Sequence, residues 1–334
     1  PKENGLILVD DVGAKFSPKN SNDWSVSGNA ANPAVLRSVD TSLNNEIVVS
    51  GVLSGSTTMT MGSTSVTSGQ YIEPWIAKAD ANGNWQWIQK ISITGTSQFA
   101  EATIQDISIA PNGDIFATGM FYDTISFGGI TLTSTGFYDC WTAKLSSSGQ
   151  WQWAQALRGN GDIDSGTATT LDIVYGTAIA TDSNNNPIIG GFFLGNTDVG
   201  IAADTGAQSG ADIEVFVAKY GNSGNIQWTE VARGQGTQEI NAMTVDGNND
   251  VWVATTFEDS MTFGNVVATA GVNEVPMCIA KINQSGTWQS AYASTGSGRP
   301  VATDFTMDDQ NNILMSGFYT GSVNLGSLLT SSGQ

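Results

Sequence analysis

The run YDCWTAKLSSSGQWQW, residues 138–153, decides the fold because variants of it recur along the chain. Its Ala-Lys pair is found five times, and the successive lysines lie 63, 66, 75 and 62 residues apart. Four of these lysines are followed by a glycine five residues on, and four by a tryptophan nine residues on. Such self-similarity is the sequence signature of a repeat architecture. The repeated residues are Lys15, Lys78, Lys144, Lys219 and Lys281, with Trp24, Trp87, Trp153 and Trp228.

Each repeat contains four strand-like runs separated by polar turns. An alternating run such as TIQDISIA (103–110) is followed by a continuous apolar run such as IFATGMF (115–121). Alternation predicts a half-buried strand, and a short apolar run predicts a strand buried on both faces. The third run ends at Ala-Lys, and the fourth carries the tryptophans. Four antiparallel strands per repeat predict the blade of a β-propeller.

The two ends of the chain supply complementary parts of a fifth repeat. Residues 301–333 have the first two strand runs, and residues 6–28 have the last two. We therefore predict one all-β domain, residues 1–334, folded as a five-bladed β-propeller whose last blade takes two strands from each terminus. The predicted blades span about 34–98, 99–161, 162–236, 237–298, and 299–334 together with 1–33.

Two other arrangements of the ends remain open. The fifth repeat is incomplete if the sequence is a truncated array. The half-blades can also pair between molecules, which produces a strand-exchanged filament. We expect a closed monomer because pairing within one molecule has the higher effective concentration.

Composition excludes several classes of function. The chain has 12 basic and 31 acidic residues, a net charge of −19 and no histidine. Such a charge repels nucleic acids and anionic membranes. Without histidine there is no Ser-His or Cys-His nucleophile pair and no imidazole ligand for a metal. No apolar run approaches the length of a membrane helix. No signal peptide is visible and the chain begins at Pro1, so we expect a processed or excised mature segment.

The repeated lysines are expected to have a structural role. A carboxylate lies five residues before four of them. A lysine stem packed between blades, with its ammonium on an acid or a carbonyl, accounts for the recurrence. A ring of charges that binds a ligand is the alternative. The carboxylates are Asp10, Glu73, Asp139 and Glu214.

The tryptophans of the fourth run occur in pairs. At a spacing of two residues along a strand, Trp85 and Trp87 are expected to share one face, as are Trp151 and Trp153. Packing between blades is the expected use of these rings. An exposed platform on which a sugar stacks is the alternative.

Asp106 and Asp304 are the candidate ligand-binding residues, because they occupy equivalent positions on the innermost strands of blades two and five. A pair of carboxyl groups can hydrolyse a glycosidic bond. However, no third acid lies in register, and no basic or aromatic subsite residues cluster nearby. We expect channel-lining residues and no catalytic residue, with a propeller-type glycoside hydrolase as an alternative.

No cofactor is expected. The Asp-rich turns 182–186, 246–250 and 308–312 offer oxygen ligands for calcium. Asp and Asn also populate such turns because they tolerate left-handed backbone and cap nearby amides, so calcium is kept only as an alternative. Cys140 and Cys278 fall in blades that are not neighbours and are expected to be buried free thiols.

The third repeat is about ten residues longer than the others, with extra residues near 162–176 and 198–213. Loops at one blade break the symmetry of a propeller, and binding residues are disproportionately found on loops. These loops are therefore the expected contact region.

The second repeat resembles the SBBP-type β-propeller repeat, through Gly119, the Phe127-Gly128 pair and the run at 138–153. The resemblance covers nearly the whole chain, although the family name implies seven blades and this chain counts to five. It implies a non-catalytic extracellular scaffold or adhesion module of a microbial surface protein or appendage. Its partner would be a protein or glycan on a cell surface, or another segment of a larger parent protein. A glycan-binding, lectin-like propeller is the alternative.

Overall fold

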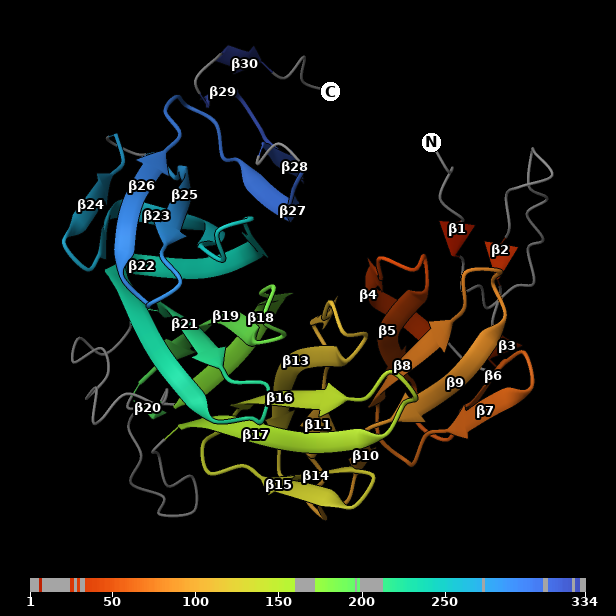
Figure 1. Ribbon diagram of the computed structural model, residues 1–334. Coiled ribbons are helices and arrows are strands. Elements are labelled where there is room, and N and C mark those ends of the chain that lie inside the picture. Colours follow the sequence, from red (N-terminus) through yellow and green to blue (C-terminus); the bar gives the residue numbers. More distant parts are fainter. Residues whose placement is uncertain are drawn as a thin grey trace. The chain divides into compact units, whose positions relative to one another are not determined.

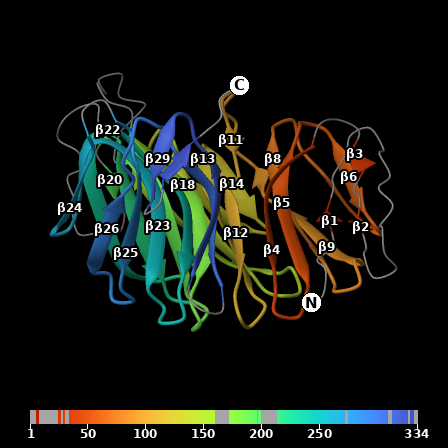
Figure 2. The same ribbon diagram turned by 90° about the horizontal axis from the view of Figure 1, so that it is seen from above.

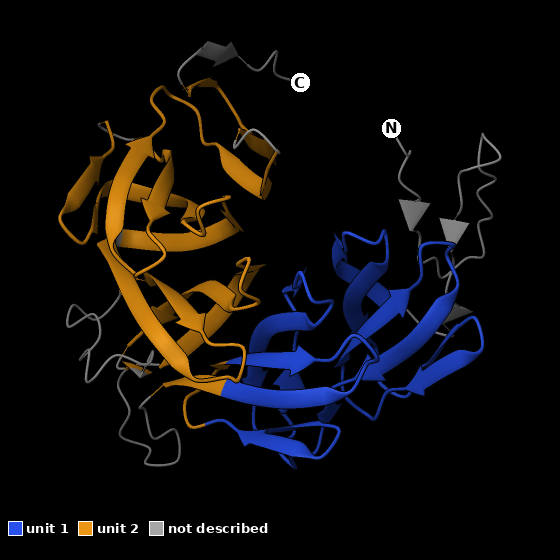
Figure 3. Ribbon diagram, viewed as in Figure 1, with its two compact units in different colours: residues 1–134, 141–155 blue, residues 135–140, 156–334 orange. Residues whose placement is uncertain are grey.

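The computed structural model describes residues 6–7, 25–26, 29–30, 34–159, 172–195, 197–198, 213–271, 274–308, 312–325 and 328–330. Within these ranges the chain is all-β, as the sequence predicts (Figure 1). None of the described residues belongs to a helix that could cross a membrane. The chain forms two compact units, residues 1–134 with 141–155 (unit 1) and residues 135–140 with 156–334 (unit 2), which Figure 3 colours separately. The single domain stays a prediction.

Four sets of four antiparallel strands have the order that the repeats predict; one is a separate sheet, one is part of a six-stranded sheet, and two are joined in an eight-stranded sheet. Figure 2 shows β23, β25 and β26 of the fourth set side by side. Blade one consists of β4 (Ala34–Thr41), β5 (Ile47–Leu53), β8 (Glu73–Ala79) and β9 (Trp85–Lys90). Blade two consists of β12 (Asp106–Ile109), β13 (Ile115–Tyr122), β16 (Asp139–Leu145) and β17 (Trp151–Gly159). Blade three consists of β18 (Ile173–Thr181), β19 (Pro187–Leu194), β21 (Glu214–Tyr220) and the first part of β22 (Ile226–Val245). Blade four consists of the rest of β22 with β23 (Val251–Phe263), β25 (Met277–Ile282) and β26 (Trp288–Ala293).

A short hairpin that the sequence analysis did not predict lies between the second and third strands of three blades. Each hairpin turns at a glycine with a positive φ, and the ring of the first tryptophan in the fourth strand lies against that glycine. The hairpins are β6 (Thr58–Met61) with β7 (Thr64–Thr67), β14 (Thr124–Phe127) with β15 (Ile130–Thr133), and the end of β23 with β24 (Val266–Thr269). The ring–glycine pairs are Trp85 with Gly62, Trp151 with Gly128 and Trp288 with Gly264.

The prediction that Trp85 and Trp87 share one face is wrong. Trp87 is opposite Lys78 and Trp85 is opposite Ala79, so a β-bulge at Gln86 lies between them. Because Lys78 and Ala79 are consecutive strand residues, they point to opposite faces, and their partners do the same. The bulge therefore sends one ring to the hairpin of its own blade and leaves the other for the opposite face.

Blade four replaces a glycine and an aromatic ring by two residues of intermediate size. In blade one, Gly51 is opposite Trp75, and a Cβ on the glycine would meet both this ring and a carbonyl of the first strand. In blade four, Thr255 is opposite Cys278. Since a core is packed at near-crystalline density, the smaller Cys278 makes room for the larger Thr255.

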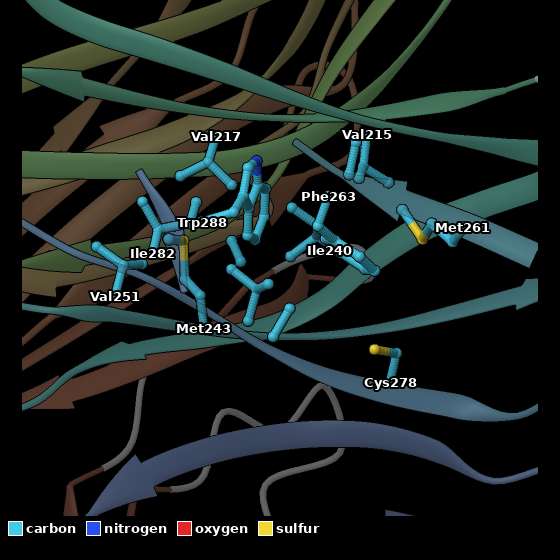
Figure 4. Close-up of a cluster of buried hydrophobic side chains, with 14 of the residues drawn as sticks. Val215, Val217, Ile240, Met243, Val251, Met261, Phe263, Cys278, Ile282 and Trp288 are labelled. Carbon is cyan, nitrogen blue, oxygen red and sulfur yellow. The ribbon is translucent and has the colours of Figure 1, made fainter. Parts of the chain in front are cut away.

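The cores lie between neighbouring sheets. In unit 2, Val215 and Val217 of blade three pack with Ile240, Val251 and Trp288 of blade four (Figure 4). A second cluster joins blade four to the C-terminal sheet through Ala242, Ala254, Met277, Ala302 and Phe305. A separate hydrophobic cluster in unit 1 is built from blade one and its hairpin.

The C-terminal sheet consists of β27 (Val301–Met307) and β28 (Ile313–Phe318). A separate two-stranded sheet follows, made of β29 (Ser322–Asn324) and β30 (Leu328–Thr330). At the other end, β1 (Leu6–Ile7) and β2 (Ser25–Val26) pair in parallel, which differs from the antiparallel hairpin predicted there. Parallel strands need a long crossover connection. Lys15, Asp10 and Trp24 lie outside the described residues, so closure of the fifth blade stays a prediction.

Candidate functional site

The repeated lysines of blades one to four form ion pairs at one end of their blades. Their partners lie in the turn between the first and second strands, at either of two positions, and Lys281 contacts both. This geometry supports the structural role that the sequence analysis expects for the lysines of the complete blades. The pairs are Lys78–Glu46 at 2.9 Å, Lys144–Asp114 at 2.8 Å, Lys219–Asp182 at 2.9 Å, and Lys281 with Asp246 at 3.1 Å and Asp250 at 2.8 Å.

The carboxylates five residues before the lysines have another role. Five residues of strand span about 17 Å, and an odd offset points the two side chains to opposite faces. Glu73 binds Lys90 at 2.7 Å and accepts the N–H of Gly69 at 2.8 Å. Asp139 accepts the N–H groups of Thr135 at 2.8 Å and Gly159 at 2.9 Å. Glu214 likewise accepts the N–H of Gly234 at 2.9 Å.

Burial shifts the pKa of acids in both groups, the acids before the lysines and the turn acids. It raises the pKa of Asp139, although the N–H groups that this carboxylate accepts act in the opposite direction. For Asp182, burial also acts to raise the pKa, but the hydrogen bonds from Lys219 and Asn186 outweigh it and leave the pKa lowered. Protonation of Asp139 on acidification therefore favours the folded chain, whereas protonation of Asp182 disfavours it.

The second tryptophan of the fourth strand reaches the next blade. Trp87 Nε1 donates to the carbonyl of Ser147 at 3.2 Å, and a Cβ on Gly149 would lie 2.7 Å from its ring. Trp228 Nε1 donates to the carbonyl of Gln284 at 3.1 Å in the same way. These bonds join blades one and two in unit 1 and blades three and four in unit 2. Trp153, on blade two, lies 5.9 Å from Phe116, measured between ring centroids.

Asp106 belongs to unit 1 and Asp304 to unit 2, and each is described within its own unit. Half-buried Asp106 accepts a hydrogen bond from Ser38 Oγ at 2.7 Å and thereby joins blade two to blade one. Asp40, which the sequence analysis missed, does the same by accepting the N–H of Ile109 at 2.7 Å. Asp304 is exposed and accepts the N–H of Phe305 at 2.8 Å.

The Asp-rich turns use their carboxylates within the fold. Asp182 Oδ1 accepts the N–H groups of Asn184 and Asn186 at 2.9 and 2.8 Å. Asp246 accepts Trp252 Nε1 at 3.0 Å in addition to its lysine. Among the described ranges, no group of three acids and cysteines is placed to hold a metal. Most of the extra residues in blade three lie outside the described residues.

Both cysteines are buried and free. Burial raises the pKa of Cys278 to about 12. This residue is therefore protonated and inert at neutral pH, in agreement with the role expected for it.

A cavity of about 540 Å³ opens at the lysine end of unit 1, between the turns of blades one and two. We call it the turn cavity. The sequence analysis missed this cavity. Its signal in the sequence is the turn of blade two, which has Gly113 where blade four has Asn249. Its walls include Leu43, Glu46, Lys78, Trp87, Asn112 and Ser147.

No protein-family model matches the chain. An uncharacterized WD repeat-containing protein, L264 of Acanthamoeba polyphaga mimivirus, is 29% identical over 179 residues, which cover 45% of this chain. The chain spans only 13% of that protein's length. The repeated sets of four antiparallel strands, together with the similarity to this relative, support a β-propeller repeat protein.

Three solved structures are similar to the chain at low identity. A protein of unknown function from Dyadobacter fermentans is 14% identical, with 85% of this chain and 74% of that one covered and a TM-score of 0.44. Virginiamycin B lyase from Staphylococcus aureus is 10% identical, with 90% and 85% covered and a TM-score of 0.35. The Synechocystis apocarotenoid oxygenase is 10% identical, with 88% and 57% covered and a TM-score of 0.39. At such scores these similarities carry no argument about function.

Proposed function

We propose that this chain is a non-catalytic β-propeller module that serves as a scaffold and binding domain of a microbial surface protein or appendage. One observation carries the proposal: the lysines that recur in all four complete blades, and two of the tryptophans that recur in three of them, are used by contacts inside the fold. The lysines bind turn acids, and Trp87 and Trp228 bind the next blade. The repeat thus specifies a rigid frame, and recognition is left to residues that differ between blades.

We also propose that the frame is a five-bladed ring whose last blade combines β27 and β28 with residues 6–28. Two uncovered surfaces support this. Val39 of β4 is 60% exposed, whereas the equivalent Ile107 and Phe305 are each 3% exposed. At β28, Leu314 and Phe318 are 53% and 61% exposed. The register of blade one, in which Val49 is opposite Ala77, predicts that Met315 is opposite Ala14.

The proposed location is extracellular, with no cofactor, and the proposed partner is a protein or a glycan on a cell surface. The net charge of −19 and the resemblance to secreted repeats support it. A glycoside hydrolase is the less favoured alternative, because Asp106 is tied to Ser38 at 2.7 Å. Glycan binding is favoured by the turn cavity, where Trp87 forms part of the wall.

Labelled protein applied to glycan arrays and to microbial cells tests the function. We expect saturable binding without turnover of any glycan that is bound. The Asp106→Asn variant, checked for unchanged thermal stability, should bind equally well. Hydrolysis that Asp106→Asn abolishes would contradict the proposal, as would the absence of binding to every cell and glycan presented.

A further inference from the structure

Two equivalent places between neighbouring blades differ in one feature. In unit 2, the first turn of blade three is joined to that of blade four, because Ser183 N–H donates to Asn249 Oδ1 at 2.9 Å. The matching residues in unit 1 are Leu43 and Gly113. Gly113 has no side chain that could accept such a bond, and Leu43 is 89% exposed. The turn cavity lies at this place.

The inner wall of the turn cavity is held by an ion pair and hydrogen bonds. Lys78 Nζ binds Glu46 at 2.9 Å and the carbonyl of Ser147 at 3.2 Å, while Trp87 donates to the same carbonyl. The Trp87 ring is only half-buried, so part of its surface faces the cavity. An aromatic ring held by a hydrogen bond offers an apolar surface at low entropic cost.

The remaining walls carry neutral polar groups. Asn44, Asn112 and Ser148 contribute amides and a hydroxyl. A volume of about 540 Å³ lies in the range of small-molecule sites. An aromatic surface beside amides and hydroxyls matches a sugar ring, which has an apolar C–H face and hydroxyl groups at its edge.

The charges on the wall of the turn cavity limit the class of ligand that can bind there. Lys78 and Glu46 neutralise each other, and the Asp80 carboxylate accepts Asn84 Nδ2 and Gln86 Nε2 at 3.1 and 3.2 Å. What remains is a slightly negative wall on a chain with a net charge of −19. This environment disfavours anionic sugars.

We propose that the turn cavity binds a short neutral saccharide, which stacks on Trp87 and hydrogen-bonds to the amides of Asn44 and Asn112. This inference rests on the binding role proposed above and assigns it to a site. In unit 2 the Ser183–Asn249 bond bridges the matching place, so we expect no saccharide to bind there.

Titration of the ¹⁵N-labelled chain with cellobiose, maltose and diacetylchitobiose, followed at the indole N–H signals, tests the proposal. Trp87→Phe identifies the Trp87 signal, and Trp228→Phe identifies its counterpart in unit 2. We expect at least one disaccharide to shift the Trp87 signal saturably, with the Trp228 signal unmoved. The anionic trisaccharide sialyllactose should leave both unmoved. If no neutral disaccharide moves the Trp87 signal, or only sialyllactose does, the proposal is overturned.

Gly113→Asn is the decisive variant, because it copies the residue that bridges blades three and four. Asn249 has a φ of 63° and Gly113 a φ of 86°, and a Cβ at Gly113 would lie 3.4 Å from Ser147 Cβ. The variant should therefore keep its melting temperature and lose saccharide affinity by about tenfold or more. Asn249→Gly in unit 2 is the matched control and should leave the affinity unchanged.

Undiminished binding by folded Gly113→Asn would overturn the site. If array binding also persists in that variant, the general binding role survives and only its assignment to the turn cavity fails. Absence of array binding by the unsubstituted chain would instead remove the binding role itself.

Discussion

β5 and β28 occupy the same place in their repeats and have similar sequences, IVVSGVL and ILMSGF, yet their burial is opposite. β5 is buried at every residue, whereas β28 is exposed at five of its six residues. β5 pairs on both edges, with β4 and β8. Among the described strands, β28 pairs only with β27. An apolar second strand therefore becomes core only when a third strand and a neighbouring sheet cover it.

The same lesson applies to the first strands. Val39 of β4 is exposed, although its equivalents in the other sheets are buried. Under the proposed ring closure, the uncovered apolar residues of β4 and β28 are two halves of one interface. The following predictions test whether residues 6–28 supply the missing half.

Deletion of residues 1–28 should have the largest effect. If these residues complete the fifth blade, their loss leaves an edge and a face uncovered, and we expect the melting temperature to fall by about 10 °C or more. Calorimetry measures the change, and the full chain should be monomeric at micromolar concentration. Equal melting temperatures for the full and shortened chains would show that β28 has no partner in residues 1–28.

Val39→Asp tests the face of blade one. In a closed ring, Val39 is buried, and the charge should lower the free energy of unfolding by about 3 kcal/mol. Leu43→Asp, four residues along and 89% exposed, is the control and should cost less than about 0.5 kcal/mol. Urea titration measures both variants. Equal small effects would mean that Val39 stays in water.

Lysine substitutions compare a complete blade with the proposed one. Lys219→Met leaves the fully buried Asp182 carboxylate without its cation, at a cost of about 3 kcal/mol. Residue Asp308 occupies the position of Asp182 in the C-terminal repeat. Lys15→Met should therefore destabilise the chain in the same direction if Lys15 reaches that turn. If Lys15→Met leaves the free energy of unfolding unchanged while Lys219→Met lowers it, Lys15 does not reach the turn that contains Asp308. The N-terminal segment would then not complete the blade that contains β28.

Acidification should have the smallest effect. The hydrogen bonds from Lys219 and Asn186 lower the pKa of Asp182 in the folded chain despite its burial. A depressed pKa contributes stability at neutral pH that disappears as the pH falls through the folded-state value. We expect Asp182→Asn to flatten the loss of stability below about pH 4, the ordinary range of a carboxylic acid. An unchanged dependence of stability on pH would mean that the shifted pKa of Asp182 does not contribute to the free energy of unfolding.

The strand order of each blade could be predicted from the sequence, because hydrophobic patterning and turn residues recur with the Ala-Lys pair. The hairpins could not, since their strands are only four residues long and rich in Thr, as in Thr58–Met61. The bulge at Gln86 also leaves no pattern in a Trp-Gln-Trp run. It reversed the expected face of one tryptophan.

The candidate site was predictable only in part. The sequence marks the repeated lysines and tryptophans, but it does not identify the acids that bind the lysines. The acids five residues before the lysines are not their partners, because strand geometry places them at the other end of the strand. The turn cavity depends on Gly113 standing where blade four has Asn249. That difference is visible in the sequence, but its consequence requires the Ser183–Asn249 hydrogen bond to be seen.

The most direct measurement of ring closure is disulfide formation in the Ala14→Cys, Met315→Cys double variant. The native Cys140 and Cys278 are buried and should not compete. The account predicts a cross-linked monomer under mild oxidation, seen as faster migration on a non-reducing gel that reverts on reduction. Cross-linked dimers and ladders, or two free thiols after oxidation, would contradict closure of the last blade within one chain.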